Sequence, residues 1–447
     1  MIIDPWTQHW AITAPQVEQI LPLLDGSRAI PDIAGAARVR NLPEFDNEEL
    51  LRGLLEQLRT AKLVYSSRAH QRSTGHPVYN TVELQGLHLE ITNACNLSCA
   101  HCYVSSGKKL PNELTTGELK SVIDQLTPFG DQILAISGGE PAVRKDCMQL
   151  VEYAVIERGL RVDLYSNAYK FPRKFAEHLV AINEVGPGLV RLQVSIEGSD
   201  AETNDAVRGP GSFEQIERSM AMFRELGLHR TLTLFSCVTQ ANVSQISKII
   251  ALAERWDVGR LAFSQWQRQG NAIDTPWESI APTKEEWCGA GELLLNYNNP
   301  RLHVRGNFFG DLNNNETGRF SLDAQLFPKH LYAYNAIPRV SPDGMIFADQ
   351  FWTTPDWSLG NVRDMTLAEA FKTEKYRQQI AAFEQRWQNI PECRQCPWLK
   401  LCESGAPGHT YAEYNDLNRR DLFCEDRIYW FERYVSQQFG KLARNTN

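Results

Sequence analysis

Three cysteines lie within eight positions of the chain, at Cys95, Cys99 and Cys102. Three thiolates from one loop can hold three irons of a [4Fe–4S] cube, because such clusters prefer cysteine ligands. An iron without a protein ligand can then bind a small molecule. The alternative is zinc, but a structural zinc site normally has four ligands, and His101 lies in a poor position to reach the same ion. The motif therefore favours an iron–sulfur cluster.

A second group of cysteines lies near the end of the chain, at Cys393, Cys396, Cys402 and Cys424. Their spacing, C-x2-C-x5-C-x21-C, gives a complete set of four thiol ligands. Taken alone, this set is almost as compatible with a structural zinc ribbon as with an iron–sulfur cluster. Both interpretations make the C-terminal region a metal-binding region.

The composition of the chain supports bound metal rather than disulfide bonds. Ten cysteines in 447 residues are too few for a disulfide scaffold, and their clustering is typical of metal binding in a reducing compartment. The net charge of −8 argues against a nucleic-acid surface. The first residues, MIIDPWTQHW, do not read as a signal peptide, and no apolar run is long enough to span a membrane. We therefore expect a cytoplasmic protein that binds neither nucleic acid nor a membrane.

The elements that must position the first cysteine group alternate between short apolar strands and amphipathic helices, from about residue 82 to residue 300. Repeated strand–helix units predict an α/β fold with a parallel sheet and right-handed crossovers. About six units suit a partial (β/α)6 barrel of the TIM type, or a full barrel, whose chemistry lies at the C-terminal ends of the strands. The strand VELQGLHLEIT comes shortly before Cys95, so the three cysteines are expected at the mouth of this barrel.

The C-x3-C-x2-C motif after the first barrel strand resembles the radical S-adenosylmethionine (SAM) superfamily. Four later segments agree: SGGEP at 137–141, YSNA at 165–168, SIEGSDAETNDAVRG at 195–209 and QGNA at 269–272. In that family the cysteines bind a [4Fe–4S] cluster whose fourth iron binds SAM, and an electron from the cluster cleaves SAM to a 5′-deoxyadenosyl radical. The resemblance covers residues 82–300 and implies the same cofactors and chemistry here.

The resemblance also assigns residues to SAM. Glycines such as Gly138 let the backbone approach a ligand closely, Glu140 supplies an acceptor for an ammonium group, and His101 is expected to pack near the adenine. Two positions depart from the family pattern, because Glu197 replaces an Asp and Asn204 replaces a His. The full set of SAM contacts that the resemblance implies is His101, Tyr103, Ser137, Gly138, Gly139, Glu140, Pro141, Ser166, Asn167, Ser195, Glu197, Arg208 and Asn271.

Beside such a barrel, the four C-terminal cysteines resemble the SPASM extension, which carries auxiliary [4Fe–4S] clusters. A second auxiliary cluster in that family needs further cysteines, but Asp349 and Ala406 stand at two of those positions here. We therefore expect one auxiliary cluster, and two [4Fe–4S] clusters in all. Asp349 is interpreted as a surface or loop carboxylate. A cluster closed by four cysteines suits electron transfer or redox tuning better than substrate binding.

Three further cysteines lie outside both motifs. Cys147 is at an apolar helix position and Cys288 is at the start of a helix, so both are interpreted as buried small hydrophobic residues. Cys237 lies near the C-terminal end of the fifth barrel strand. A packed core position is the favoured interpretation, but a thiol that faces the lumen there could donate a hydrogen atom to a substrate radical, as in radical SAM peptide epimerases.

Residues 1–78 form a separate expected domain, with a strand or hairpin, three helices, a further strand in KLVYSS and a linker. The patterns LLDG-x-R-x-I-x-x-I and EELLRGLLEQLRTAKLV resemble the PqqD-like, winged-helix recognition element of ribosomally made, post-translationally modified peptides (RiPPs). Such domains bind a leader peptide by strand addition. The alternative is a winged helix for nucleic acid, but the unit lacks a dense basic recognition helix.

Together these expectations describe a peptide maturase with domains at 1–78, 79–300 and 301–447, the last being loop-rich and ending in an aromatic helix. Oxidative side-chain crosslinking is the favoured reaction, and epimerisation with Cys237 as hydrogen donor is the first alternative. Maturation of a tetrapyrrole or small cofactor, and a non-catalytic zinc-binding adaptor, are the others. The expected partners are a precursor peptide and an electron donor such as flavodoxin or ferredoxin.

Overall fold

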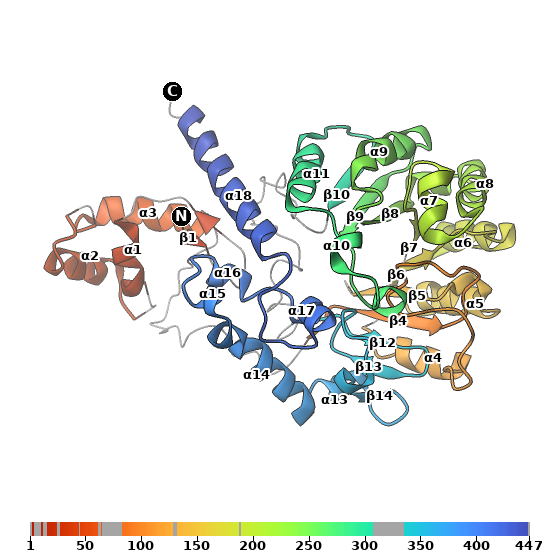
Figure 1. Cartoon of the computed structure of the whole chain (residues 1–447). Helices are drawn as coiled ribbons and strands as arrows, with labels where there is room; N and C mark the ends of the chain where they lie inside the picture. The colour runs from red at the N-terminus through yellow and green to blue at the C-terminus, as the bar shows by residue number, and fades with distance from the viewer. Residues whose placement is uncertain are drawn as a thin grey trace. The chain divides into compact units, whose positions relative to one another are not determined.

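The computed structural model describes residues 2–3, 10–11, 16–24, 27–43, 45–60, 64, 83–127, 132–186, 189–306 and 335–445 (Figure 1). Contacts divide the chain into two units. In the described residues the first unit ends at residue 64, and the second begins at residue 83.

The N-terminal unit contains a short antiparallel pair of strands, β1 (Ile2–Ile3) and β2 (Trp10–Ala11), followed by helices. The helices are α1 (Val17–Ile20), which continues into the 3-10 turn η1 (Leu21–Leu23), α2 (Ile30–Val39) and α3 (Glu48–Thr60). They share one apolar core that includes Ile20, Leu23, Ala37 and Leu51. The strand expected in KLVYSS lies outside the described residues except for residue 64.

The second unit is built on six parallel strands that lie side by side in chain order. They are β4 (Gly86–Thr92), β5 (Ile133–Gly138), β6 (Arg161–Ser166), β7 (Leu189–Ser195), β8 (Thr233–Val238) and β9 (Arg260–Gln265). The expected parallel α/β architecture is therefore confirmed. β10 (His303–Gly306) adds to β9, while β4 pairs with β5 and β12 (Arg339–Val340), so the strands form a partial rather than a closed barrel.

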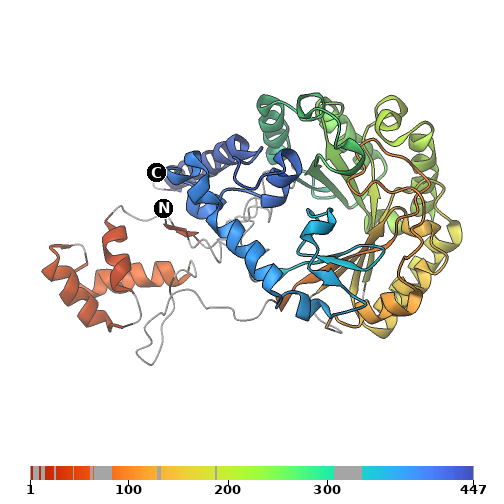
Figure 2. The same ribbon diagram turned by 60° about the horizontal axis from the view of Figure 1, so that its bottom comes forward.

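Helices cover the outer side of this arc of strands (Figure 2). The main ones are α4 (Thr116–Ile123), α5 (Cys147–Glu152) with its π-helical continuation η3 (Tyr153–Glu157), α6 (Arg173–Val185), α7 (Ala201–Arg208), α8 (Ser212–Glu225), α9 (Ile246–Arg255) and α11 (Lys284–Asn296). Shorter turns are η2 (Pro141–Val143), η4 (Leu228–Arg230), η5 (Val243–Gln245), η6 (Gly270–Ala272) and α10 (Trp277–Ile280). In α9, Ile246, Ile249, Ile250 and Ala253 are buried, which is the spacing of one helix face against the sheet.

The C-terminal part continues the same sheet. β12 pairs with β13 (Met345–Phe347), which pairs with β14 (Gly360–Asn361), while β11 (Asn335–Ala336) pairs with β3 (Glu83–Leu84). Beyond the sheet lie η8 (Pro355–Trp357), α13 (Leu367–Ala370), α14 (Glu374–Asn389), α15 (Pro391–Arg394), α16 (Leu399–Cys402), α17 (Pro407–Tyr414) and α18 (Cys424–Asn445).

The expectation of a loop-rich C-terminal region is wrong for residues 374–445, which are mostly helical. Helix α14 was not predicted because its sequence is largely polar. In the structure Tyr376, Phe383 and Arg386 lie on one buried face of this helix. The expected aromatic terminal helix is confirmed as α18. Among the described residues, none of the helices combines the length and the apolar character that a membrane crossing requires.

Candidate functional site

A cavity of about 310 Å³ lies within the barrel, at the C-terminal ends of the six strands. Most residues assigned from the sequence line it. They are Cys95, Cys99, His101, Cys102, Tyr103, Ser137, Gly138, Gly139, Ser166, Asn167, Ser195, Glu197, Arg208 and Cys237. Glu140, Pro141 and Asn271 lie outside this lining, and Pro141 begins the turn η2.

The three-cysteine loop follows β4 and is fixed by backbone hydrogen bonds. The Cys95 amide donates to the Gly107 carbonyl at 2.9 Å, which closes the loop on itself. Asn271 ties the loop to the turn after β9, because its side chain donates to the Cys99 carbonyl and its amide to the Cys102 carbonyl, each at 2.9 Å. Asn271 therefore positions the loop in this structure rather than facing the cavity.

Glycines at the end of β5 allow two backbone segments to approach closely. Gly138 has φ of +131°, and a Cβ atom on it would lie 2.2 Å from the Thr92 carbonyl oxygen. A Cβ atom on Gly139 would lie 2.2 Å from the Ala94 carbonyl oxygen. A side chain at either position would displace the loop that carries the cysteines, so the glycine requirement is steric.

Glu140 is buried just after β5 and holds the end of β6. Its carboxylate accepts hydrogen bonds from the Asn167 amide at 2.7 Å, the Ser166 hydroxyl at 2.9 Å and the Ala142 amide at 3.1 Å. Burial raises the pKa of Glu140, although these hydrogen bonds oppose the shift. The Asn167 side chain in turn donates to the Cys95 sulfur at 3.7 Å. Glu140 thus connects β5, β6 and the cysteine loop.

Glu197 is the centre of a second buried cluster. Its Oε1 lies 3.1 Å from Arg208 Nη1 and 3.2 Å from His101 Nε2, and its Oε2 accepts from the Cys237 amide at 2.9 Å. Asn204 accepts from the Glu197 amide at 2.9 Å. The two departures from the family pattern, Glu197 and Asn204, are therefore direct hydrogen-bond partners.

The electrostatics of the loop favour thiols until a metal centre binds. Burial raises the pKa of Cys99 to about 11 and also raises that of Cys95. Burial would lower the pKa of Arg208, but the nearby Cys99 and Glu197 raise it above its usual value. Cluster binding must release protons from these thiols, and the buried guanidinium offsets part of the resulting negative charge.

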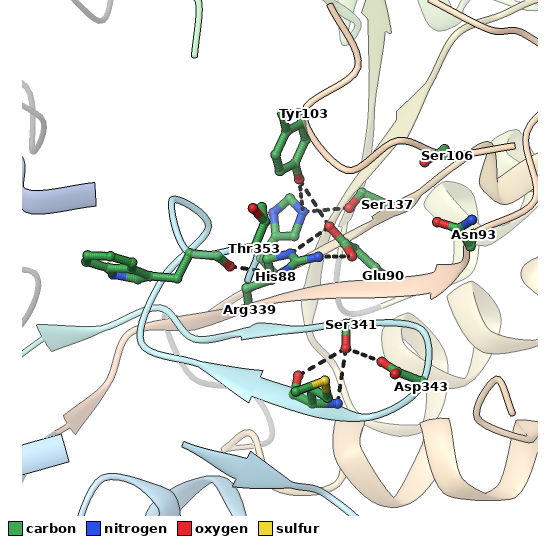
Figure 3. Close-up of polar contacts among 12 residues, drawn as sticks. His88, Glu90, Asn93, Tyr103, Ser106, Ser137, Arg339, Ser341, Asp343 and Thr353 are labelled. Carbon is green, nitrogen blue, oxygen red and sulfur yellow. Dashed lines mark hydrogen bonds and ion pairs between the residues drawn. The ribbon is translucent and has the colours of Figure 1, made fainter. Parts of the chain in front are cut away.

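A buried polar network that was not predicted from the sequence lies on the lumen side of β4 (Figure 3). His88 Nε2 lies 2.6 Å from the Ser137 hydroxyl and 3.4 Å from the Tyr103 hydroxyl, which also donates to Glu90 at 3.2 Å. Arg339 of β12 makes two bonds to Glu90, at 2.8 and 2.7 Å. Burial lowers the pKa of His88 to about 4, so its ring is neutral at pH 7. The alternation of Leu87, His88, Leu89 and Glu90 was the available signal.

The four C-terminal cysteines line a separate pocket of about 50 Å³, together with Ser404, Arg420, Asp421 and Arg427. Arg420 has a raised pKa because its side chain donates a hydrogen bond to Cys424. Arg427 pairs with Asp421 at 2.7 Å, and both are almost fully buried. Burial raises the pKa of Cys402 to about 12.

Both cysteine sets fit an iron–sulfur cluster by the chemistry of their donors. Three thiols and two close-packed glycines border the large cavity, while four thiols and two arginines surround the small pocket. Among the described residues, no three His, Cys, Asp or Glu side chains gather closely enough for one metal ion. A four-iron cube has a different requirement, because each thiolate binds a different corner.

The two positions at which SPASM domains carry further cysteines are buried here. Asp349 follows β13 and is only 6% exposed, and its Oδ1 accepts from the Phe351 amide at 2.6 Å. Of the two expected alternatives, a surface or a loop carboxylate, it is the loop carboxylate, and the turn folds its side chain inward. Ala406 is also buried, and its amide donates to Asp421 at 2.9 Å. Nearby, His409 lies between Phe351 and Phe423.

The three remaining cysteines differ in their surroundings. Cys147 is fully buried, as expected for a small hydrophobic residue, whereas Cys288 is only partly buried. The favoured packed-core interpretation of Cys237 is not what the structure describes, because Cys237 is partly exposed and lines the cavity. Alternate residues of β8 face the lumen, and Cys237 is one of them. Burial raises its pKa strongly, which keeps the thiol protonated.

Comparison with known proteins identifies two families along the chain. The family described as the radical SAM superfamily matches residues 89–253, and the SPASM iron–sulfur cluster-binding domain matches residues 338–397. Mycofactocin maturase MftC of Mycolicibacterium smegmatis is 36% identical over 197 residues, which cover 44% of this chain and 48% of that protein. Fe-coproporphyrin III synthase of Methanosarcina barkeri is 30% identical over 360 residues, which cover 75% of this chain and 86% of that protein.

Solved structures share the fold at low sequence identity. Native anSMEcpe, solved with bound AdoMet and the Cp18Cys peptide, has a TM-score of 0.62 at 19% identity, covering 82% of this chain and 100% of that chain. Streptococcus suis SuiB, solved with its precursor peptide SuiA, has a TM-score of 0.61 at 16% identity, covering 83% of this chain and 86% of that chain.

Three findings lead to the same assignment. They are the two family matches, the alignment of 360 residues with Fe-coproporphyrin III synthase, and the fold shared with the solved structures. They exclude the non-catalytic zinc adaptor and establish SAM and iron–sulfur clusters as the cofactors. The chain belongs to the radical SAM superfamily and is an enzyme with a SPASM iron–sulfur domain.

Proposed function

We propose that this enzyme modifies a ribosomally made precursor peptide with a 5′-deoxyadenosyl radical obtained by reductive cleavage of SAM. The favoured modification is an oxidative crosslink between side chains, through a C–C, C–O or thioether bond. The observation that carries the proposal is the contrast between the two cysteine sets. Three cysteines of one loop border a large cavity, while four others surround their own small pocket. The fold shared with SuiB and anSMEcpe, both solved with peptides, supports a peptide substrate.

The residues of the chain have separate tasks in this proposal. Cys95, Cys99 and Cys102 would hold the cluster that, when bound, supplies the electron and the SAM-binding iron. Asn271 holds the carbonyls of that loop, and Glu197 orients His101 against the cavity wall. The other residues assigned to SAM from the sequence remain proposed contacts.

Crosslinking removes two hydrogens from the peptide, so two electrons must leave it. One hydrogen would leave the peptide as an atom and be recovered in 5′-deoxyadenosine. The second hydrogen leaves as a proton and an electron. Cys393, Cys396, Cys402 and Cys424 would hold the auxiliary cluster that supplies a one-electron acceptor, and Arg420 and Arg427 provide positive charge beside it. A flavodoxin or ferredoxin is the proposed external electron partner. The proposed location is the cytoplasm, whose reducing environment keeps the ten cysteines from forming disulfide bonds.

The N-terminal unit is proposed to bind the leader of the precursor. Its strand pair, β1 and β2, and its three helices are consistent with a PqqD-like recognition element, and residues 1–78 are the proposed extent. An exposed strand edge can accept a peptide strand by main-chain hydrogen bonds. The remaining proposed domains are the barrel at 79–300 and the auxiliary-cluster domain at 301–447.

Epimerisation is a second candidate because the Cys237 thiol lines the cavity. Epimerisation is redox-neutral for the peptide and needs a hydrogen-atom donor, and a protonated thiol is suited to that task. One electron from the auxiliary cluster and one proton would then restore the thiol. The Cys237→Ala variant separates the two reactions. Ser264 is a matched control, because it pairs in register with Cys237 and lines the same cavity. Unimpaired product formation by Cys237→Ala, with Ser264→Ala as reference, would exclude the epimerase.

Modification of a tetrapyrrole is a third candidate. It is favoured by the 30% identity to Fe-coproporphyrin III synthase over 86% of that protein. The N-terminal unit favours the peptide instead. A binding measurement with a small peptide encoded beside the gene, and with iron coproporphyrin III, distinguishes the two.

The proposal is tested by anaerobic reconstitution followed by incubation of that peptide with SAM and dithionite. Two [4Fe–4S] clusters require about eight irons and eight sulfides per chain. Mass spectrometry should then find a peptide that has lost two hydrogens, together with 5′-deoxyadenosine. An unchanged mass with deuterium uptake from D2O would indicate epimerisation. A colourless protein without iron, or no product with either substrate, would refute the proposal.

A further inference from the structure

The lumen of the barrel carries arginines on three strands, of which one lines the cavity and two lie nearer the N-terminal ends of their strands. Alternate residues of a strand face the same side of the sheet. Gln193 and Ser195 of β7 line the cavity, so Arg191 lies on the lumen face. By the same alternation, Arg260 shares the face of Ser264 on β9, and Arg305 of β10 lines the cavity itself.

These three arginines, together with Arg161 of β6, act on one carboxylate across the lumen. Arg191, Arg305, Arg260 and Arg161 all act electrostatically on Asp163 of β6. Arg305 also acts on Tyr165, although β7, β8 and β9 separate β10 from β6 in the sheet. Only side chains that project into the curved interior can interact over that separation. The arginine set, defined as Arg191, Arg260 and Arg305, therefore surrounds a common space.

The positive charge of this space is not neutralised by the described part of the chain. The four guanidinium groups act together on the Asp163 carboxylate, and burial raises its pKa despite their opposing effect. Among the described residues, no member of the arginine set has a hydrogen-bond or ion-pair partner. A guanidinium carries five N–H donors and stays charged at any pH relevant to proteins. The set thus presents unused donors and an excess of positive charge to the lumen.

We propose that the arginine set binds carboxylate groups of the substrate while its reacting carbon lies in the cavity. This inference rests on the proposed function and specifies its substrate class. Guanidinium groups suit carboxylates because they can bind them bidentately. Arg305 pairs in register with Ala262, two residues before Ser264, and Arg260 precedes Ser264 by four. At about 3.3 Å per residue, the anchored carboxylates lie roughly 7–13 Å below the level of Ser264.

Such carboxylates have two sources in the candidate substrates. A peptide supplies its C-terminus or acidic side chains, and a tetrapyrrole supplies propionate side chains. The experiment compares four probes on the anaerobic, iron-loaded full chain. They are iron coproporphyrin III, its tetramethyl ester, the peptide encoded beside the gene, and that peptide amidated at its C-terminus with every Asp and Glu changed to Asn and Gln.

We expect one acid-form probe to bind the unmodified enzyme, and its neutral counterpart to bind about 10- to 100-fold more weakly, the loss expected for charged hydrogen bonds. The double variant Arg260→Gln/Arg305→Gln should bind the acid form correspondingly more weakly. The matched control is Arg218→Gln, because Arg218 lies on α8 outside the barrel, exposed and paired with Glu214. It should bind like the unmodified enzyme. Which acid form binds identifies the source of the carboxylate.

Equal binding of acid and neutral forms would overturn the inference, as would unchanged binding by the double variant or no binding by either acid form. The comparison of probes on the unmodified enzyme decides the question even if the double variant fails to fold. Formation of 5′-deoxyadenosine by the unmodified enzyme without any probe is measured separately. Its absence would refute the proposed radical function, while the binding result would still report on the arginine set.

Discussion

Removing Arg339 should destabilise the barrel, because it leaves the buried carboxylate of Glu90 without a partner charge. Glu90 is 1% exposed and Arg339 is 4% exposed, and two hydrogen bonds join them across β4 and β12. Arg339 also donates to the Trp352 carbonyl at 3.0 Å. Removing one partner of a buried ion pair costs about 3–5 kcal/mol, because the other charge loses its compensation. The Arg339→Met variant keeps much of the side-chain volume and should show that loss.

The size of the expected thermal shift follows from the size of the unit. For roughly 350 residues, an unfolding entropy of about 2.1 cal/mol/K per residue converts this cost to a decrease in Tm of about 4–7 °C. Circular dichroism of the metal-free chain measures the Tm. Arg218→Met is the control, because its partner Glu214 is exposed and such pairs contribute about 0–1 kcal/mol.

A double variant separates the loss of charge pairing from the loss of packing. Glu90→Leu with Arg339→Met removes both charges, and replacement of a complete buried pair is often neutral or stabilising. We therefore expect the double variant to recover most of the Tm lost by Arg339→Met alone. The reasoning would be refuted if Arg339→Met changed the Tm no more than the surface control, or if the double variant melted lower than both single variants.

Three further perturbations test the glycines, the acid response and the auxiliary site. Gly139→Ala should abolish 5′-deoxyadenosine formation, because the new Cβ atom would lie 2.2 Å from the Ala94 carbonyl oxygen and displace the cysteine loop. A chromatographic assay that found 5′-deoxyadenosine formed at the wild-type rate would contradict this. Burial lowers the pKa of His409 to about 4, so the folded protein favours the neutral ring. The folded state therefore has its full stability above pH 6.5, the pKa of an exposed histidine. As the pH falls from 6.5 to 4, the free energy of unfolding should decrease by about 3 kcal/mol in all. His409→Phe should reduce the fall in Tm over that pH range, and an unchanged pH profile would count against the assignment. Cys393→Ser should lower the iron content by about four per chain while 5′-deoxyadenosine is still formed, as measured by iron analysis; full iron content would show that this residue is not a ligand.

Local patterns predicted the barrel and the arrangement of its motifs. The alternation of strands and helices indicated the parallel sheet, and the loop after β4 was expected at the barrel mouth, where Cys95 and its neighbours line the cavity. These features depend on the rule that parallel strands end at one edge of the sheet, which needs no knowledge of distant contacts. The family resemblance supplied the residues that accompany the cysteines.

Features that depend on distant partners were not predictable in the same way. Glu90 and Arg339 are 249 positions apart, and no local pattern pairs them. The burial of Asp349 depends on how the turn after β13 packs, so its sequence neighbourhood alone could not decide between a surface and a loop carboxylate. The arginine set could not be recognised because Arg191, Arg260 and Arg305 lie on three different strands and meet only when the sheet curves.

The sheet that continues from β4 into β12, β13 and β14 determines where this protein can be cut. All seven residues of β4 are buried, and β12 covers one of its edges. A fragment that ended at residue 300, the expected boundary of the barrel domain, would expose the backbone donors and acceptors of β4 that now pair with β12 at residues 339–340. Unpaired apolar edge strands promote aggregation. Expression of the barrel alone should therefore yield insoluble protein unless the β12–β14 segment is retained or grafted beside β4.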